Sequence, residues 1–151
     1  MLQCDGLRGP DFIQLHGAET PDRVAAIKAR TGIPVFKAIP VAAASDVSAA
    51  EAYAAIADQI LFDSKATPGA ELPGGNGVAF DWTMLTKAHA PFALSGGLDA
   101  SNVAEAVRRT GAALVDVSSG VETAPGEKDA TLITQFIQAA RSAAPQHAKA
   151  S

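Results

Sequence analysis

The feature that most constrains this fold is a repeated phrase in which a short apolar run is followed by a helix-start signal. Strands that are apolar along their length and alternate with helices are typical of a parallel sheet, because each crossover lays a helix against the sheet. With 151 residues, the chain is long enough for one domain with a sizeable core. We therefore expect a single α/β domain built on a parallel sheet.

Five apolar runs have the length and composition of buried strands. They comprise residues 12–15, 35–39, 60–63, 92–95 and 114–117. In both closed barrels and open doubly wound sheets, ligands bind where parallel strands end. The residues that end each run are therefore the candidates for function.

Helix boundaries are marked by residues that favour the N-cap, where a side-chain oxygen accepts a hydrogen bond from a free backbone N–H group. The predicted starts are Thr20 before Pro21, a capping box over residues 48–51, Asp81, Ser101 and about Asp129. Residues 1–143 are expected to form the domain, and residues 144–151 a disordered tail.

Composition argues against several classes of partner and site. The net charge is -4, without the basic stripe that binds a phosphate backbone, so nucleic acid is not an expected partner. Cys4 is the single cysteine, and no second histidine or cysteine stands at a metal-ligand spacing, so we expect no metal. Neither a signal peptide nor a run of about 20 apolar residues is present, which predicts a cytoplasmic protein without a membrane partner.

Glycine and serine residues follow the last two predicted strands. Gly96 and Gly97 follow the fourth run, whereas Ser118, Ser119 and Gly120 follow the fifth. Glycine lets a phosphate approach the main chain, and free N–H groups at a helix start favour an anion. Glycine is also common in tight turns that bind nothing. Two such sites on adjacent strands favour a phosphate site made by the last two loops.

Two aspartates at strand ends are candidates for chemistry. Asp63 follows three apolar residues, where partial desolvation would tune a carboxyl for proton transfer, or it simply accepts local backbone N–H groups. Asp116 interrupts an apolar strand and needs partners if buried, so it belongs to a structural network or contacts a substrate. His16 is more typical of a hydrogen-bonded spacer, and Lys37 either faces the site or pairs with an acid.

An ordered set of motifs resembles that of phosphoribosylanthranilate isomerase. The motifs are Gln14-Leu15-His16-Gly17, Leu61-Phe62-Asp63-Ser64, Gly74-Gly75-Asn76-Gly77 with Phe80-Asp81-Trp82, Leu94-Ser95-Gly96-Gly97-Leu98, and Val115-Asp116-Val117-Ser118-Ser119-Gly120-Val121-Glu122 with Pro125-Gly126-Glu127-Lys128-Asp129. The resemblance covers residues 11 to 141. It implies a TIM (β/α)8 barrel that catalyses, without a cofactor, the Amadori rearrangement of N-(5-phosphoribosyl)anthranilate in tryptophan biosynthesis.

The same resemblance implies a role for each candidate residue. Asp63 would be the general acid that protonates the ribose ring oxygen, and Asp116 would line the anthranilate side of the pocket. The two loops, Gly96-Gly97 and Ser118-Ser119-Gly120, would hold the phosphate. The expected partner is therefore a small phosphorylated sugar joined to anthranilate, with neither cofactor nor metal.

The front of the family barrel has no match in this sequence. In the family, a Lys-Ile-Cys-Gly motif on the first strand supplies the general base, and an arginine before the fourth strand binds the anthranilate carboxylate. Cys4 is not expected to replace that base. Eight βα units need about 200 residues, so we expect an incomplete barrel whose five strands correspond to strands 4 to 8. Such a chain would be inactive alone, and its open edges would favour self-association or complementation.

Two other interpretations stay open from the sequence. A flavodoxin-like or receiver-type binding module also has five parallel strands with an aspartate ending the third, although a receiver needs an acidic pair where this chain has His16-Gly17. The other is a non-catalytic phosphate-binding barrel fragment, or one piece of a split enzyme. A carboxyl of Asp63 far from both glycine turns, or a strand in an antiparallel sheet, would exclude the isomerase.

Overall fold

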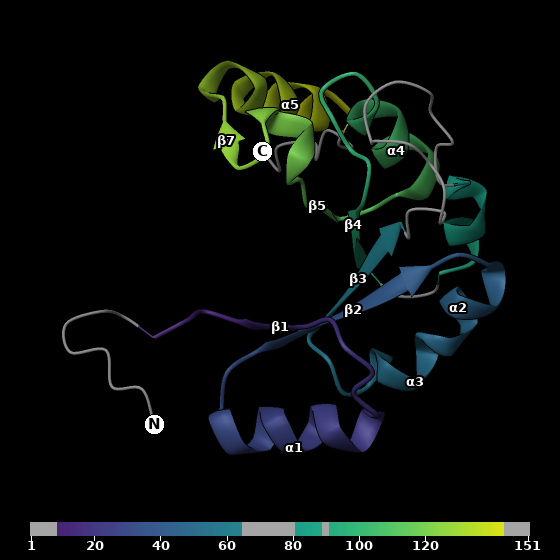
Figure 1. The fold of residues 1–151 in the computed structure, drawn as a ribbon. Coiled ribbons are helices and arrows are strands. Elements are labelled where there is room, and N and C mark those ends of the chain that lie inside the picture. Colours follow the sequence, from purple (N-terminus) through teal and green to yellow (C-terminus); the bar gives the residue numbers. More distant parts are fainter. Residues whose placement is uncertain (1–8, 65–80, 89–90, 144–151) are drawn as a thin grey trace, which may run out of the picture.

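The computed structural model describes residues 9–64, 81–88 and 91–143 of the chain. Its main element is a parallel sheet of five strands, each paired with the next in the sequence (Figure 1). The strands are β1 (Ile13–Leu15), β2 (Val35–Val41), β3 (Gln59–Ser64), β4 (Phe92–Ser95) and β5 (Leu114–Val115). The predicted α/β class and the parallel sheet are confirmed.

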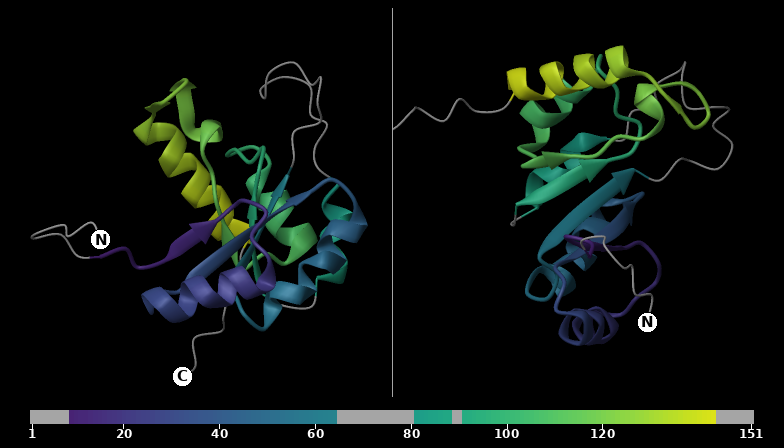
Figure 2. Two further views of the ribbon diagram at one scale, coloured as in Figure 1. Left: turned by 60° about the horizontal axis from the view of Figure 1, so that its bottom comes forward. Right: turned by 90° about the vertical axis from the view of Figure 1, so that its left-hand side faces the viewer.

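The order of the strands separates two of the interpretations. In a flavodoxin-like sheet the order is 2-1-3-4-5 and helices cover both faces. Here the order is β1-β2-β3-β4-β5, and the helices form an arc on one side of the sheet (Figure 1). The right-hand view of Figure 2 looks onto the other side, where the strands lie between α5 at one end and α1 at the other. Consecutive strands with helices outside are the arrangement of a β/α barrel, so the flavodoxin-like or receiver-type alternative is wrong.

The first helix is bounded by the residues that the sequence indicates. Helix α1 (Pro21–Thr31) begins after Thr20, whose hydroxyl accepts a hydrogen bond from the N–H of Arg23 at 3.3 Å. It ends at Gly32, whose φ of 67° lies in the left-handed region that glycine adopts at little cost.

The second and fourth of the predicted helices begin at other residues than the sequence indicated. Helix α2 (Ala44–Ala49) starts before residue 48, because the carboxylate of Asp46 accepts the N–H groups of Ala42 and Ala43 at 2.8 and 2.9 Å. The predicted capping box is therefore wrong, and a separate short helix α3 (Glu51–Ala54) follows.

Helix α4 (Val103–Thr110) begins beyond Ser101, which does not cap it. The carboxylate of Asp99 accepts the N–H groups of Ser101 and Asn102, at 2.7 and 3.2 Å. The segment between the end of β4 at Ser95 and the start of α4 at Val103 is therefore a turn held by the hydrogen bonds of Asp99.

The remaining elements close the last two units. The 3-10 helix η1 (Trp82–Lys87) begins at Asp81, which accepts the N–H of Thr83 at 3.0 Å as predicted. After β5 come the 3-10 helix η2 (Ser119–Val121) and an unpredicted antiparallel hairpin, β6 (Glu122–Ala124) with β7 (Glu127–Lys128). Helix α5 (Ala130–Ala143) follows, and Asp129 accepts the N–H of Leu132 at 2.8 Å.

The two faces of the sheet have different environments. The face under the helices is the core, in which Phe62 and Leu94 are almost fully buried and Phe62 meets Phe92 edge to face at 5.2 Å. On the other face, Phe12 stacks on Phe36 at 4.4 Å but remains 48% exposed, as does Leu114. The core therefore forms between sheet and helices, leaving the opposite face for a site.

Lys37 is the buried polar residue of the core in the described part of the chain, at 2% exposed. Its ammonium donates to Glu19 at 3.0 Å, to the carbonyl groups of Gly17 and Ala38 at 2.8 and 3.0 Å, and lies 5.7 Å from the ring centre of Tyr53. Of the two options from the sequence, Lys37 thus pairs with an acid. It ties the connection between β1 and α1 onto β2.

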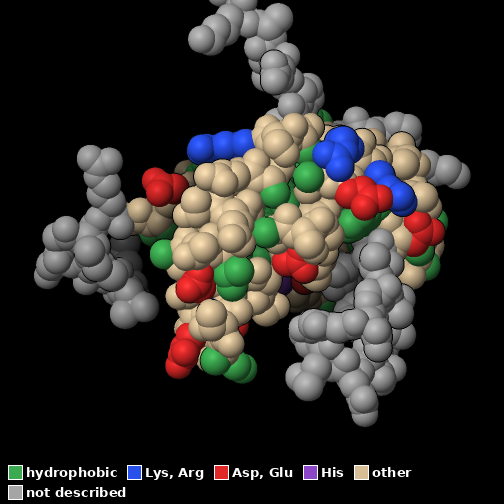
Figure 3. Space-filling model, turned by 90° about the horizontal axis from the view of Figure 1, so that it is seen from above, with side chains coloured by type: hydrophobic (Ala, Val, Ile, Leu, Met, Phe, Trp, Pro, Cys, Tyr) green, Lys and Arg blue, Asp and Glu red, His purple; other side chains and the backbone are tan. Residues whose placement is uncertain are grey.

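Acidic and basic side chains are interspersed on the surface seen from above, without a continuous basic stripe (Figure 3). Among the helices of the described residues, none has both the length and the apolar character needed to cross a bilayer.

Candidate functional site

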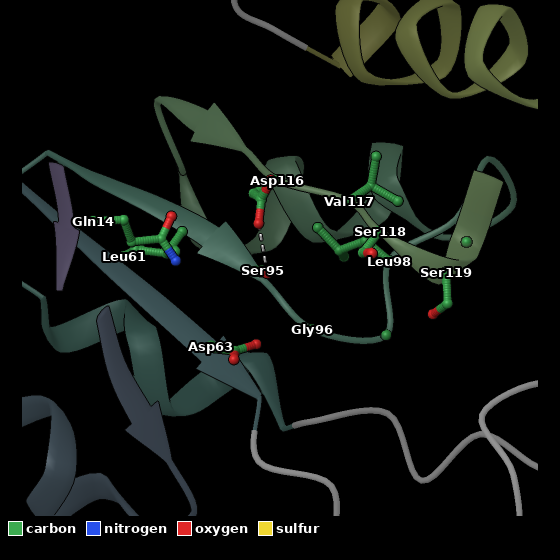
Figure 4. A pocket seen from close by; sticks show the side chains of 12 residues that line it. Gln14, Leu61, Asp63, Ser95, Gly96, Leu98, Asp116, Val117, Ser118 and Ser119 are labelled. Carbon is green, nitrogen blue, oxygen red and sulfur yellow. Dashed lines mark hydrogen bonds between the residues drawn. The ribbon is translucent and has the colours of Figure 1, made fainter. Parts of the chain in front are cut away.

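A pocket of about 290 Å³ lies where β3, β4 and β5 end (Figure 4). This is the edge at which barrels bind ligands. Every residue predicted for the site lines it: Asp63, Gly96, Gly97, Asp116, Ser118, Ser119 and Gly120. The structure thus brings these residues together, and their individual roles stay predictions.

Asp63 stands near the end of β3 and faces the pocket. In the register of the sheet it pairs with Pro40 of β2 and Ser95 of β4. Partial burial against the sheet raises the pKa of Asp63, and the charge of Asp116 raises it further, whereas the hydroxyl of Ser95 acts in the opposite direction. Asp63 therefore keeps its proton to a higher pH than an ordinary aspartate, as a general acid should.

Asp116 lies just after β5 and is exposed to solvent, not buried within a strand as its apolar neighbours suggested. Its N–H donates to the carbonyl of Leu94 at 2.8 Å, which extends the pairing between β4 and β5. Its carboxylate accepts a hydrogen bond from Ser95 Oγ at 3.1 Å (Figure 4). Asp116 thus has a structural partner and also faces the pocket.

The turn after β4 requires glycine. Gly96 and Gly97 have φ values of 90° and 64°, which L side chains rarely adopt. The carbonyl of Gly97 accepts a hydrogen bond from Asn102 Nδ2 at 2.9 Å. Because α4 begins only at Val103, one residue later than predicted, the N–H groups nearest the pocket belong to this turn.

The loops after β4 and β5 touch each other at Gly120. A Cβ atom at this position would lie 1.9 Å from the carbonyl oxygen of Leu98. Any other residue would therefore push the two loops apart. Ser119 and Gly120 also begin η2, so their N–H groups have no partner within that short helix.

Lys128, which was not among the predicted site residues, binds the loop after β5. Its ammonium donates to the carbonyl of Ser118 at 2.9 Å, and forms an ion pair with Glu122 at 2.6 Å. The hydrogen bond from Lys128 and a further one from the N–H of Gly126 lower the pKa of Glu122. The β6–β7 hairpin thereby positions the loop that begins at Ser118.

Sequence reasoning missed two polar residues of the lining, Gln14 and Ser95, although both lie within quoted motifs. A polar residue at an inward position of an apolar strand is the signal that could have found Gln14. His16 is exposed and does not line the pocket. Cys4 lies outside the described residues, as do the motif residues 74–77 and the predicted tail, residues 144–151.

Comparison with protein families gives one assignment for most of the chain. The family described as "N-(5'phosphoribosyl)anthranilate (PRA) isomerase" matches residues 5–139. The N-(5'-phosphoribosyl)anthranilate isomerase of Paramagnetospirillum magneticum is 58% identical over 137 residues, which are 89% of this chain and 64% of that protein. The chain thus spans less than two thirds of the length of this curated relative.

Solved structures agree with the sequence match. Phosphoribosyl anthranilate isomerase from Thermotoga maritima superposes with a TM-score of 0.74 at 36% identity, covering 87% of this chain and 62% of that one. A phosphoribosyl anthranilate isomerase in complex with reduced 1-(o-carboxyphenylamino)-1-deoxyribulose 5-phosphate gives a TM-score of 0.70 at 33% identity, covering 87% and 60%.

Proposed function

We propose, because this chain belongs to the N-(5′-phosphoribosyl)anthranilate isomerase family, that its pocket serves the Amadori rearrangement of N-(5-phosphoribosyl)anthranilate. The observation that carries this proposal is the position of Asp63. Its carboxyl has a raised pKa and faces the same pocket as the two glycine-bearing loops. An acid on one side and a cradle for an anion on the other suit a phosphorylated sugar whose ring must be opened.

Asp63 acts in the first step as the general acid. Its proton passes to the ribose ring oxygen, the bond between that oxygen and C1 breaks, and the nitrogen lone pair forms the C=N bond of a Schiff base. A base then removes the proton from C2, and the resulting enol becomes the ketone. The raised pKa of Asp63 supports this role, since it keeps the proton on the carboxyl to a higher pH than in an ordinary aspartate.

The two loops hold the substrate's phosphate. The positive φ values of Gly96 and Gly97 keep side chains away from the turn, and Gly120 lets the second loop approach the first. Backbone N–H groups from Ser119 and Gly120 then act together with those of the first turn as donors to the phosphate oxygens. A phosphate ester at the ends of the last two strands is the common barrel arrangement.

Asp116 lines the anthranilate side of the pocket. Ser95 donates to Asp116 Oδ2 at 3.1 Å, and the carboxylate faces the pocket, where it can accept the N–H of the substrate's amine. The negative charge of Asp116 also favours the cationic Schiff base that forms when the ring opens. A role in tryptophan biosynthesis agrees with the cytoplasmic location expected from the sequence.

The five strands correspond to strands 4 to 8 of the family barrel, and the chain alone has little or no isomerase activity. The family's Lys-Ile-Cys-Gly motif, which carries the general base, does not occur in the sequence. The outer strands β1 and β5 each pair with one neighbour only within the described sheet. Such edges, together with the exposed Phe12 and Leu114, support complementation by a front segment or self-association.

A complementation assay tests this function. The 151-residue chain is assayed for conversion of N-(5-phosphoribosyl)anthranilate alone, and then together with a polypeptide that carries the first three βα units of a relative. We expect turnover only for the mixture. Turnover by the chain alone at an ordinary enzymatic rate contradicts the proposed inactivity.

Binding of ribose 5-phosphate to the chain alone tests the phosphate site separately, by calorimetry or NMR. Gly120→Ala should weaken this binding, because the added Cβ separates the two loops. Gly9→Ala is the control, since that glycine has open space around it. If Gly120→Ala and Gly9→Ala bind ribose 5-phosphate equally well, the two loops do not hold the phosphate. Phosphate binding without turnover by the complemented mixture would instead favour the non-catalytic fragment.

A further inference from the structure

Ser95 is the side chain that lies between the two carboxyl groups of the pocket (Figure 4). It is the last residue of β4, and its register partner on β3 is Asp63. On the other side, Ser95 Oγ donates to Asp116 Oδ2 at 3.1 Å. The sheet therefore places one hydroxyl between two acids that belong to different strands.

Two acids at one pocket create a difficulty for proton donation. While Asp63 holds its proton, the pocket carries the single negative charge of Asp116. Once Asp63 has given the proton away, two carboxylates face each other across Ser95. Like charges at short range disfavour this state, and the charge of Asp116 already raises the pKa of Asp63 after the larger effect of burial.

The described surroundings of Asp63 supply little else to offset the second charge. Its neighbour on β2 is Pro40, and the lining from β1 is the neutral side chain of Gln14. Ser118 and Ser119 contribute hydroxyl groups from the loop after β5. No cationic side chain is among the described residues of the lining, and Lys37 is bonded to Glu19 elsewhere.

A serine hydroxyl has one proton to donate and can rotate to present it to either neighbour. Hydrogen bonds to an ionised acceptor are about twice as strong as those between neutral groups. Once both carboxyl groups are ionised, the hydroxyl can donate to only one of them. Water can replace it at Asp116, which is exposed to solvent, whereas desolvation is the main cause of the raised pKa of Asp63, so the hydroxyl is needed more at Asp63. In agreement with this, its contact with Asp63 acts to lower the pKa of that acid.

We propose that Ser95 is a positioning residue whose hydroxyl turns from Asp116 towards Asp63 when Asp63 has donated its proton, and thereby stabilises the pair of carboxylates. This inference rests on the proposed role of Asp63 as the general acid. No bond to Ser95 breaks or forms covalently, because the proton of Asp63 passes to the ring oxygen of the substrate and the serine keeps its own.

Titration of Asp63 in the 151-residue chain tests this directly. The carboxyl carbon of Asp63 is followed by ¹³C NMR against pH in the natural sequence and in Ser95→Ala, Ser95→Thr and Ser101→Ala. We expect Ser95→Ala to shift the midpoint of Asp63 to higher pH, and Ser95→Thr to restore it. Ser101→Ala removes a similar hydrogen bond, from Ser101 Oγ to Asp99 at 2.6 Å, outside the pocket lining and should change nothing.

A kinetic readout follows in the complemented enzyme. Ser95→Ala should lower kcat roughly 2- to 10-fold, as expected for one lost hydrogen bond, with little change in KM. The basic limb of the pH profile should move with the midpoint of Asp63. A merely structural role would lower stability and leave this limb in place.

The outcomes separate this inference from the proposed function. An Asp63 midpoint that stays or falls in Ser95→Ala overturns the role of Ser95, and so does a shift that threonine fails to reverse. If the midpoint shifts as expected but the complemented enzyme works equally well without the carboxyl of Asp63, the general acid is wrong. In that case the hydrogen bonding of Ser95 is established without its catalytic purpose.

Discussion

The two faces of the sheet do different work, although they are made by alternate residues of the same strands. Phe62 and Leu94 point towards the helices and are almost fully buried. Their neighbours Asp63 and Ser95 point the other way and line the pocket. Because side chains alternate along a strand, a shift of one residue separates stability from chemistry. Substitutions on the two faces should therefore have opposite signatures.

The largest effect is expected on the pocket face. Asp63→Asn removes the proposed proton donor while keeping the shape of the side chain. In the complemented enzyme the isomerase rate should fall by about 10²- to 10⁴-fold, the usual contribution of a general acid. Unfolding in urea should show no loss of stability. Asp22→Asn, which changes an exposed aspartate in the first turn of α1, serves as control.

A rate for Asp63→Asn within a few-fold of the natural sequence would remove the general acid from the pocket face. The pocket face would then no longer be distinguished by catalysis, although the helix face would still be distinguished by its packing.

The helix face should show the reverse signature. Leu94 has no exposed surface, so Leu94→Ala leaves a cavity and should lower the free energy of unfolding by about 2–5 kcal/mol. Asp63 need not move, and its ¹³C titration should keep its midpoint at temperatures where the variant is folded. Chemical denaturation and the titration of the same sample measure both quantities. A cost below about 1 kcal/mol would mean that this face is packed less tightly than its burial indicates.

A smaller effect on stability is expected when an ion pair on the helix side of the sheet is broken. Lys37→Met removes the ammonium from Glu19 and two carbonyl groups, and should cost about 1–3 kcal/mol. Lys28→Met breaks the ion pair with Asp58. The side chains of Lys28 and Asp58 are 40% and 38% exposed, so the loss of stability should be at most about 1 kcal/mol. Thermal unfolding of the two variants compares them. Equal costs would show that burial does not decide the strength of these pairs.

Much of this arrangement could be predicted from local sequence. The apolar runs gave the strands, and Thr20 and Gly32 marked the ends of α1, because capping depends on a few adjacent residues. Asp63 and the glycine pair could be placed at the pocket because parallel strands end at a common edge. The residue roles also needed the family resemblance, and they stay predictions.

What could not be predicted depends on contacts between distant segments. Ser95 matters through the register that places it beside Asp63 and the loop that brings Asp116 to its other side. Lys128 reaches Ser118 only because the β6–β7 hairpin folds back. The start of α2 was missed for a local reason, since Asp46 bonds backward to the N–H of Ala42 from within the helix.

The smallest effects compare two carboxyl groups whose pKa values move in opposite directions. Burial raises the pKa of Glu19, but its hydrogen bond from Lys37 and those from backbone groups outweigh this, so the net pKa is lowered from 4.5. A lowered pKa in the folded state means stability that is present above the unfolded pKa and is lost as pH falls through the folded one. The pKa of Asp63 is raised from 3.8, so its contribution is most favourable below that value and is lost as pH rises through the folded pKa.

Stability measured against pH in two variants separates these contributions. Asp63→Asn should be slightly more stable than the natural sequence at neutral pH, because asparagine carries no charge beside Asp116, and the difference should shrink as the solution is acidified through the pKa of Asp63. Glu19→Gln should be less stable at neutral pH, and its deficit should disappear towards low pH, where Glu19 is protonated in both states. Urea midpoints are measured from acidic to neutral pH, on both sides of the ordinary values of 3.8 for aspartate and 4.5 for glutamate. If stability depends on pH in the same way in the two variants, the pocket does not raise the pKa of Asp63. The contrast between the two faces would then rest on packing alone.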